Sequence, residues 1–361
     1  MKIFMKKTLM YLVAINAWIV GGLLLSLPSA HALEIYNGNG QTLNIFGQVQ
    51  AGFMNKAARS IYEETEHKGG IEGDVRLGFI GRSAISTNIS GIAHVEWDLN
   101  SWEKDDKNLV TRYAYTGFDF GPMGVLTIGQ QDTATYQTIG FTDVFERWGS
   151  ESNAYWALGG RQEGQAAYVN AIGGYTLATS YQTSFDDAGE IENHDLETTE
   201  KVDVDYGFAG SLSYNWERNT VLKGLAFSVS ADYYKFKDPI DIRGRRSFNV
   251  ALSYGYLNDG FYTALLYSRI KHAGEEHHLT GAEVVAGYTF ENGLGFMTGY
   301  NYKGYELHKT DTSYINAQVS YDVSPAMRVY AEGRFGVGQR EFDLADKTLR
   351  NLWTLSAQYK F

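Results

Sequence analysis

The chain has 361 residues, no cysteine, 4 prolines, 40 glycines and 26 tyrosines, and its formal net charge at pH 7 is −11. The absence of cysteine excludes thiol catalysis, cysteine-based zinc sites and a disulfide scaffold. Phosphate binding needs clustered Lys and Arg, so an acidic chain predicts no nucleic-acid partner. The hydrophobic share of 44% is too low for a helical membrane protein.

The first 32 residues have the layout of a cleaved secretory signal peptide. Three lysines precede a long apolar run, and Ala30-His31-Ala32 is a small-x-small cleavage site. A retained membrane anchor is the alternative, because the run is long enough to span a bilayer. We predict a signal peptide over 1–32 and one mature domain over 33–361. A secreted, acidic chain without cysteine suits a Gram-negative envelope.

The last ten residues alternate between an apolar and a polar face. Trp353, Leu355, Tyr359 and Phe361 lie on one face, and Thr354, Ser356, Gln358 and Lys360 on the other. This period of two is typical of a β-strand. Elsewhere in the chain the polar face repeatedly carries Arg, Glu, Asp and Gln, while aromatic residues stand at the ends of the apolar face. Such aromatic ends match the girdles of a membrane barrel, whose closed sheet satisfies every backbone group in lipid.

The same alternation recurs along the mature chain and predicts sixteen strands. Short connections, such as 257–260 and 291–294, alternate with long ones, such as 131–160 and 183–204. We therefore predict an all-β fold, a 16-stranded antiparallel transmembrane β-barrel with short periplasmic turns and long external loops. The predicted strands span 43–54, 73–82, 89–99, 109–119, 124–130, 161–170, 174–182, 205–216, 224–236, 245–256, 260–270, 279–290, 294–303, 312–322, 327–337 and 350–361.

Several segments resemble the general diffusion porins of enterobacterial outer membranes. The mature start over 33–47, Arg76 to Phe79 and Thr111-Arg112 with Gly117-Phe118 are similar to that family's early strands. The most specific match is the segment 140–149, which resembles the family's constriction loop after the fifth strand. Tyr359 and Phe361 match the final aromatic signature that the outer-membrane assembly machinery reads.

The resemblance implies a homotrimer of barrels, passive diffusion of small hydrophilic solutes and ions, and a third loop, 131–160, folded into the lumen. The length and apolar content of that segment also favour inward folding. A barrel of this width leaves an aqueous channel. The resemblance places a basic wall (Arg76, Arg112 and Arg161) opposite an acidic loop residue, Asp143, and we expect Glu146 and Glu151 of the same loop to join it. Basic wall and acidic loop together set a transverse field. The alternative is that some of these residues only hold the loop in place.

The sequence departs from the family at three places. Arg147 stands where the family has its second loop acid, Gln48 stands where a wall lysine is usual, and the loop over 100–108 is short for one that latches a neighbouring barrel. The ion preference and the latch therefore stay open.

Other functions leave weaker signals. His94 shares a lumen face with Glu96 and Asp98, which allows an acid–base or metal site, although a histidine on a channel wall is commonly plain lining. We predict no enzyme, no catalytic residue, no metal and no cofactor. A solute-specific channel, for example for sugars, is the alternative function, with Tyr136, Phe118 and Tyr234 as lumen candidates. A receptor barrel with a blocked lumen is a third hypothesis.

Acidic residues crowd the connection over 186–200. A solvated loop is the plain interpretation, and divalent cations shared with lipopolysaccharide are the alternative. We expect lipopolysaccharide and outer-membrane lipid around the barrel, which predicts a multi-pass protein of the Gram-negative outer membrane.

Overall fold

The computed structural model describes residues 32–58, 68–100, 109–158, 160–193, 196, 198–217, 221–237, 241–305, 311–337 and 351–361. The predicted signal peptide, apart from Ala32, and the short connection over 101–108 lie outside these residues. In the part of the chain that the structure describes, we find no helix long and apolar enough to cross a membrane.

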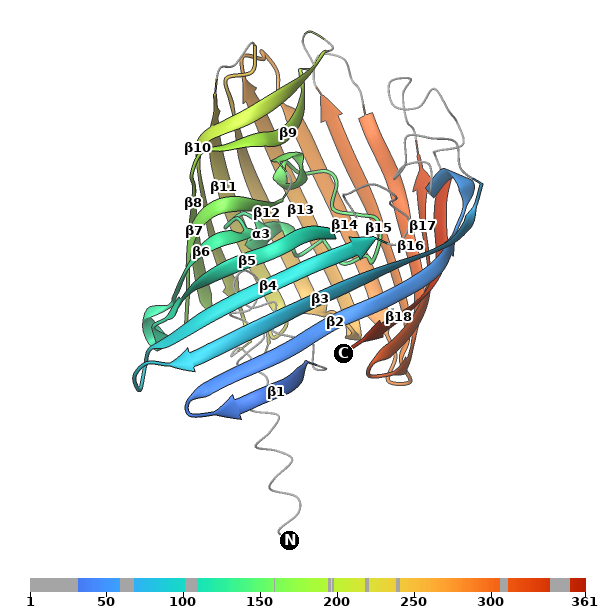
Figure 1. Cartoon of the computed structure of the whole chain (residues 1–361). Coiled ribbons are helices and arrows are strands. Elements are labelled where there is room, and N and C mark those ends of the chain that lie inside the picture. The colour runs from blue at the N-terminus through green and yellow to red at the C-terminus, as the bar shows by residue number, and fades with distance from the viewer. Residues whose placement is uncertain are drawn as a thin grey trace.

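The described part of the chain is built mostly of strands (Figure 1). They are β1 (Leu33–Gly38), β2 (Gln41–Met54), β3 (Gly70–Ala84), β4 (Ser90–Asn100), β5 (Leu109–Asp119), β6 (Val125–Asp132), β7 (Arg161–Ile172), β8 (Tyr175–Gln182), β9 (Phe185–Asn193), β10 (Thr198–Asn215), β11 (Leu225–Phe236), β12 (Gly244–Tyr256), β13 (Asp259–Ala273), β14 (Leu279–Thr289), β15 (Leu294–Tyr305), β16 (Asp311–Ser324), β17 (Met327–Gly336) and β18 (Asn351–Lys360). Short helices with described bounds are η1 (Gly121–Met123), α3 (Tyr136–Ile139) and η2 (Tyr155–Leu158).

Sixteen of the described strands close one antiparallel barrel. Each pairs with its neighbour in the chain, except that β8 pairs with β10, and β18 returns to β2. The other two, β1 and β9, only extend hairpins, because β1 pairs with β2 and β9 with β10. The sixteen-stranded barrel predicted from the sequence is therefore confirmed.

The barrel wall is apolar outside and polar inside. On β18, Trp353, Leu355 and Tyr359 are 45%, 60% and 49% exposed, whereas Thr354 and Gln358 are buried. A soluble sandwich buries its apolar face instead. This inverted alternation suits a wall with lipid outside and a lumen inside.

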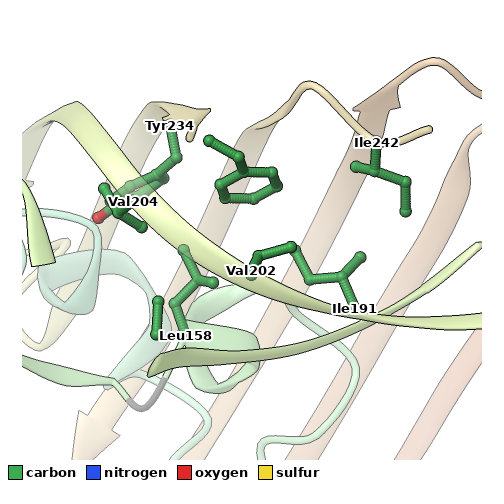
Figure 2. Packing of buried hydrophobic residues seen from close by; sticks show 8 residues of the cluster. Leu158, Ile191, Val202, Val204, Tyr234 and Ile242 are labelled. Carbon is green, nitrogen blue, oxygen red and sulfur yellow. The ribbon is translucent and has the colours of Figure 1, made fainter. Parts of the chain in front are cut away.

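The connection over 183–204 was predicted as a plain loop, and this is wrong. It contains β9 and the first part of β10, paired from Thr198–Asn193 to Val204–Phe185. Its few apolar residues, among them Ile191, Val202 and Val204, are buried on one side of the hairpin. Leu158, Ile191, Val202, Val204, Tyr234 and Ile242 pack together (Figure 2), with Ala188 and Phe236 completing the cluster. The hairpin is thereby held against η2 and the external end of β11.

The strand β1 is also absent from the sixteen predicted strands, whereas its hairpin partner β2 corresponds to the predicted strand 43–54. The turn between them is Asn39-Gly40, with φ of 54° and 74°. Asn-Gly readily adopts the positive φ values that a two-residue hairpin turn requires. The sequence therefore carried a signal for this hairpin.

Candidate functional site: the lumen and its inward loop

The segment between β6 and β7 lies inside the barrel. Helix α3 packs against β10, β11 and β12. Thr138 and Ser228 of β11 are joined by a hydrogen bond of 2.7 Å, and the Tyr262 hydroxyl on β13 donates to the Phe141 carbonyl at 2.7 Å. Figure 1 shows this segment, in green, within the ring of strands. The inward folding of the predicted loop 131–160 is thus present in the structure.

The loop tip is held by one carboxylate of the barrel wall. The backbone N–H groups of Glu146, Arg147 and Trp148 donate to the Glu332 carboxylate on β17 at 3.0, 3.1 and 2.8 Å. The side-chain amide of Asn316 on β16 donates to the Trp148 carbonyl at 2.8 Å. Three backbone hydrogen bonds thus converge on one buried carboxyl group, which fixes the position of the tip.

A second carboxylate holds both limbs of the loop. Glu283 on β14 accepts hydrogen bonds from the Thr142 hydroxyl, from the Ser152 N–H at 2.9 Å and from the Asn153 amide at 3.3 Å. On β12, the Arg245 guanidinium donates to the Ala154 carbonyl at 2.6 Å. Sequence reasoning missed Glu283 and Glu332. Their only signal was an acid at a lumen-facing position in the middle of a strand.

Two of the predicted wall arginines lie together, but acids lie beside them. Arg76 Nε on β3 is 2.9 Å from Asp98 and 3.3 Å from Glu96. Arg112 of β5 binds the same two carboxylates, with its Nη1 2.9 Å from Asp98 and its Nε on Glu96. The wall is therefore a mixed cluster of two bases and two acids, rather than the purely basic surface that was expected.

A β-bulge explains how Arg112 reaches this cluster. The register of β4 and β5 shifts so that Glu96 pairs with Tyr113 and Trp97 with Thr111. Arg112 is the extra residue. A bulge lets neighbouring residues escape strict alternation, so Arg112 binds the lumen cluster although Tyr113, directly after it, is also buried on that side.

The third predicted arginine, Arg161, opens β7 away from this cluster. Its Nε is 3.6 Å from Asp132, and its guanidinium carbon lies 5.2 Å from the Tyr113 ring centre and 5.6 Å from the Trp156 ring centre. The Tyr113 hydroxyl also donates to Asp132, at 2.6 Å. Arg161 therefore joins the wall to η2 of the loop through charge and aromatic contacts.

The predicted loop acids have partners of their own. Asp143 accepts a hydrogen bond of 2.8 Å from the Tyr136 hydroxyl of the same loop. Burial raises the pKa of the Asp143 carboxyl, against the opposing effects of Tyr136 and Arg161. Glu151 is 3.0 Å from Arg334 of β17. Asp143 thus stays near the wall arginines, whereas Glu151 ties the loop to the opposite wall.

Glu146 lies among cations of the last two strands. Its carboxylate is 3.3 Å from Arg328 and 3.9 Å from Lys360, and it accepts a hydrogen bond of 3.1 Å from Gln358. Burial tends to raise the pKa of Glu146, but the charges of Lys360 and Arg328 outweigh it and lower the pKa. Arg147 next to it binds Asp74 of β3 at 2.6 Å.

The structure also shows the surroundings of the residues that were considered for other functions. His94 is buried, bonds to the Tyr115 hydroxyl at 3.0 Å and stacks on Tyr113. Across the described residues, no group of three or more potential ligands is arranged to hold a metal ion. Phe118 was expected in the lumen, and this is wrong, because it is 48% exposed on the face opposite Tyr113 and Tyr115. Tyr234 lies on the inner face of β11 with Ser228 and Asp232, as expected, and is buried there in the cluster under the external hairpin.

The last residue pairs with the first strand of the barrel. The Phe361 N–H donates to the Gly47 carbonyl at 3.0 Å, and the Gly47 N–H donates to the Phe361 carbonyl at 2.8 Å. Tyr359 faces outward and is stacked near Phe361, with 6.4 Å between the ring centres. The chain end therefore takes part in closing the barrel.

Comparison with known proteins identifies the family to which this chain belongs. A model described as Gram-negative porin matches residues 23–339. The chain is a Gram-negative porin. Among its relatives, the outer membrane porin PhoE of Enterobacter cloacae is 29% identical over 304 residues, which cover 79% of this chain and 80% of that protein. Outer membrane porin C of Enterobacter cloacae subsp. cloacae is 26% identical over 330 residues, covering 86% and 88%.

Solved structures agree on the fold. A Salmonella typhi OmpF complex with daunomycin matches this porin with a TM-score of 0.74 at 19% identity, covering 91% of this chain and all of that one. An anion-selective porin from Comamonas acidovorans matches with a TM-score of 0.68 at 13% identity, covering 89% and 100%. The family and the barrel place this porin in the Gram-negative outer membrane, where its relatives are passive channels.

Proposed function

We propose that small hydrophilic solutes and ions diffuse passively through this porin, past the opening between the inward loop and the wall of β3, β4 and β5. One observation carries the proposal. The backbone bonds of the loop run to β13, β14, β16 and β17 through Tyr262, Glu283, Asn316 and Glu332. The loop therefore lines the far wall, and its other side looks across the lumen at the charged cluster.

We further propose that this opening discriminates weakly between cations and anions. Arg76 and Arg112 face the equal and opposite charges of Glu96 and Asp98 at 2.9–3.3 Å. Paired charges at this distance leave little net potential for a passing ion, although the local dipoles still orient polar solutes. The residues assigned to the constriction are Arg76, Arg112 and Arg161 on the wall, and Asp143, Glu146, Arg147 and Glu151 on the loop, the last three mainly as loop fasteners.

The porin acts as a homotrimer in this proposal, as expected for the family, within lipopolysaccharide and outer-membrane lipid. Aromatic residues at the external end of the outer wall, such as Tyr206, Phe208 and Tyr233, support the lipid contact. Tyr359 and Phe361 are proposed as the signal for the assembly machinery. A catalytic role is not proposed, because His94 is enclosed by Tyr113, Tyr115 and Phe46.

Single-channel recording of the purified protein in a planar bilayer tests the proposal. We expect large ohmic steps arriving in groups of three and a small reversal potential in a salt gradient. Silent insertions of a barrel that still shows heat-dependent gel mobility would refute a diffusion channel. Conductance that saturates with one class of sugar would instead favour a solute-specific channel.

A further inference from the structure

The barrel closes where its last strand meets its first. At this seam, Gln48–Met54 of β2 pair with Lys360–Thr354 of β18, whereas the adjoining β2–β3 ladder runs over the whole of Gln41–Met54. The two strands of the seam come from opposite ends of the chain. No hairpin turn joins them. The seam is therefore held by the hydrogen bonds of its short ladder and by side chains that contact both strands.

Three consecutive loop residues, Glu146-Arg147-Trp148, lie over this seam. Their backbone is fixed to one side of it, because all three N–H groups donate to Glu332 on β17. The Glu146 side chain stays on that side as well, with Arg328 on β17 and Gln358 and Lys360 on β18.

The side chains of Arg147 and Trp148, in contrast, contact residues on the other side of the seam. Arg147 Nη2 donates to Asp74 on β3 at 2.6 Å, and the two side chains are only 11% and 15% exposed. The Gln50 amide on β2 lies beside the same guanidinium, and once its oxygen and nitrogen are exchanged to satisfy their neighbours, the oxygen accepts from Arg147 Nε at 2.8 Å. Arg147 thus joins β17, through its backbone, to β2 and β3, through its side chain.

Trp148 crosses the same seam with apolar contacts. Its side chain is 4% exposed and packs in one cluster with Met54 of β2, Leu352 of β18, and Ala57 and Ala58 just beyond β2. Burying an aromatic side chain of this size is among the largest apolar contributions available to a protein. Polar and apolar contacts across the seam therefore come from adjacent residues.

We propose that Glu146-Arg147-Trp148 forms a clamp that holds the closing seam of the barrel, with Arg147 as its positioning residue. A buried charge that loses its partner is strongly destabilising, so breaking the Arg147–Asp74 pair weakens the closure between β18 and β2. The inward loop then has two tasks, narrowing the lumen and locking the barrel shut.

The test compares heat-induced unfolding of variants, followed as the conversion of the folded to the unfolded band on a gel. Arg147→Gln is expected to unfold about fivefold faster or more at a fixed temperature, the effect of roughly one kcal/mol or more. Arg334→Gln is the matched control, because the Arg334–Glu151 pair also ties the loop to the wall but stays on β17. It is expected to unfold within about twofold of the unchanged protein.

A disulfide between β2 and β18 tests whether Arg147 acts at the seam itself or only by supporting the loop. Ala51 and Ala357 are direct partners across β2 and β18, and the chain has no cysteine of its own. Ala51→Cys with Ala357→Cys, once oxidised, is expected to restore slow unfolding to Arg147→Gln, and reduction is expected to remove that rescue. If Arg147→Gln does not fold, Asp74→Asn takes its place. Unfolding of Arg147→Gln at the unchanged rate, or acceleration that persists in the oxidised form, would overturn the clamp.

Discussion

Arg112 shows how a single residue sets the balance of charge in the lumen. It binds Glu96 and Asp98, and Arg76 binds the same two acids. Arg112→Gln should leave the wall more negative and raise the cation-to-anion permeability ratio about tenfold, since a unit charge about 6 Å from an ion in water contributes about 0.7 kcal/mol, which favours a cation and disfavours an anion by the same amount. The reversal potential in a salt gradient measures this ratio.

Glu96→Gln provides the opposite change at the same place. It should shift the reversal potential toward anions, and the Arg112→Gln, Glu96→Gln double variant should return it near the starting value. A double variant as cation-preferring as Arg112→Gln alone would show that Glu96 does not balance Arg112.

For single residues, the sequence predicted which side chains face the lumen better than it predicted which of them bind one another. Alternation put Arg76, Arg112, Glu96 and Asp98 on the lumen face, yet their mutual pairing depends on the register of three strands and on the bulge at Arg112. Local propensity does not specify register. The same holds for Glu332, because nothing in its own strand shows that three backbone N–H groups of a distant loop will meet it.

Among the elements, the closing strands depend on a glycine with no room for a side chain. A Cβ on Gly47 would lie 2.4 Å from the Arg76 carbonyl oxygen and 2.9 Å from the Phe361 ring. Gly47→Ala should displace Phe361 and destabilise the barrel by about 1–3 kcal/mol, the usual effect of overpacking. Gly81→Ala on β3 is the control, because a Cβ there meets nothing within 4 Å.

Heat-dependent gel mobility and the yield of folded protein give the readout for both glycine variants. We expect a lower unfolding temperature and a smaller folded fraction for Gly47→Ala alone. Equal behaviour of the two variants would show that the terminal ring has space to move.

The external hairpin of β9 and β10 offers two neighbouring residues with opposite surroundings. Val202 is buried in the cluster of Figure 2, whereas the Lys201 side chain is 85% exposed. Val202→Ser should weaken the seating of the hairpin by about 1.5–3 kcal/mol, and Lys201→Ser should not. Limited proteolysis of the folded protein should then cut the hairpin faster only in Val202→Ser, while the barrel keeps its gel mobility. Equal cleavage of both variants would contradict the packing.

The sixteen barrel strands were predictable because a wall with lipid on one side and a lumen on the other imposes a period of two along every strand. The hairpin was missed for a physical reason. Its apolar residues, such as Ile191 and Val202, are interspersed with acids, and they pack against η2 and β11 rather than lipid. Composition alone therefore made a structured element look like a solvated loop.

Across the whole molecule, the excess negative charge and the charges that line the pore lie in different places. The chain carries −11, and 8 of its 42 acidic residues lie in the segment 185–204 of the external hairpin. At this end of the barrel Asp186 pairs with Lys237 and Asp205 with Lys235, while Asp187 and Glu190 are exposed. The lumen cluster, in contrast, balances Arg76 and Arg112 with Glu96 and Asp98. Exposed charges at the mouth concentrate cations only over the Debye length, about 10 Å at 0.1 M salt and about 3 Å at 1 M.

A modest cation preference at 0.1 M salt should therefore fade toward none at 1 M in the unchanged protein. Arg112→Gln should keep part of its cation preference at 1 M. In this variant Glu96 and Asp98 are balanced by Arg76 alone, and their excess charge lies directly beside the path of the ion, where salt screens it less. Reversal potentials measured at the same concentration ratio but different mean salt test both statements. A preference in the unchanged protein that is independent of salt would place its origin in the lumen and contradict the balance of the wall cluster.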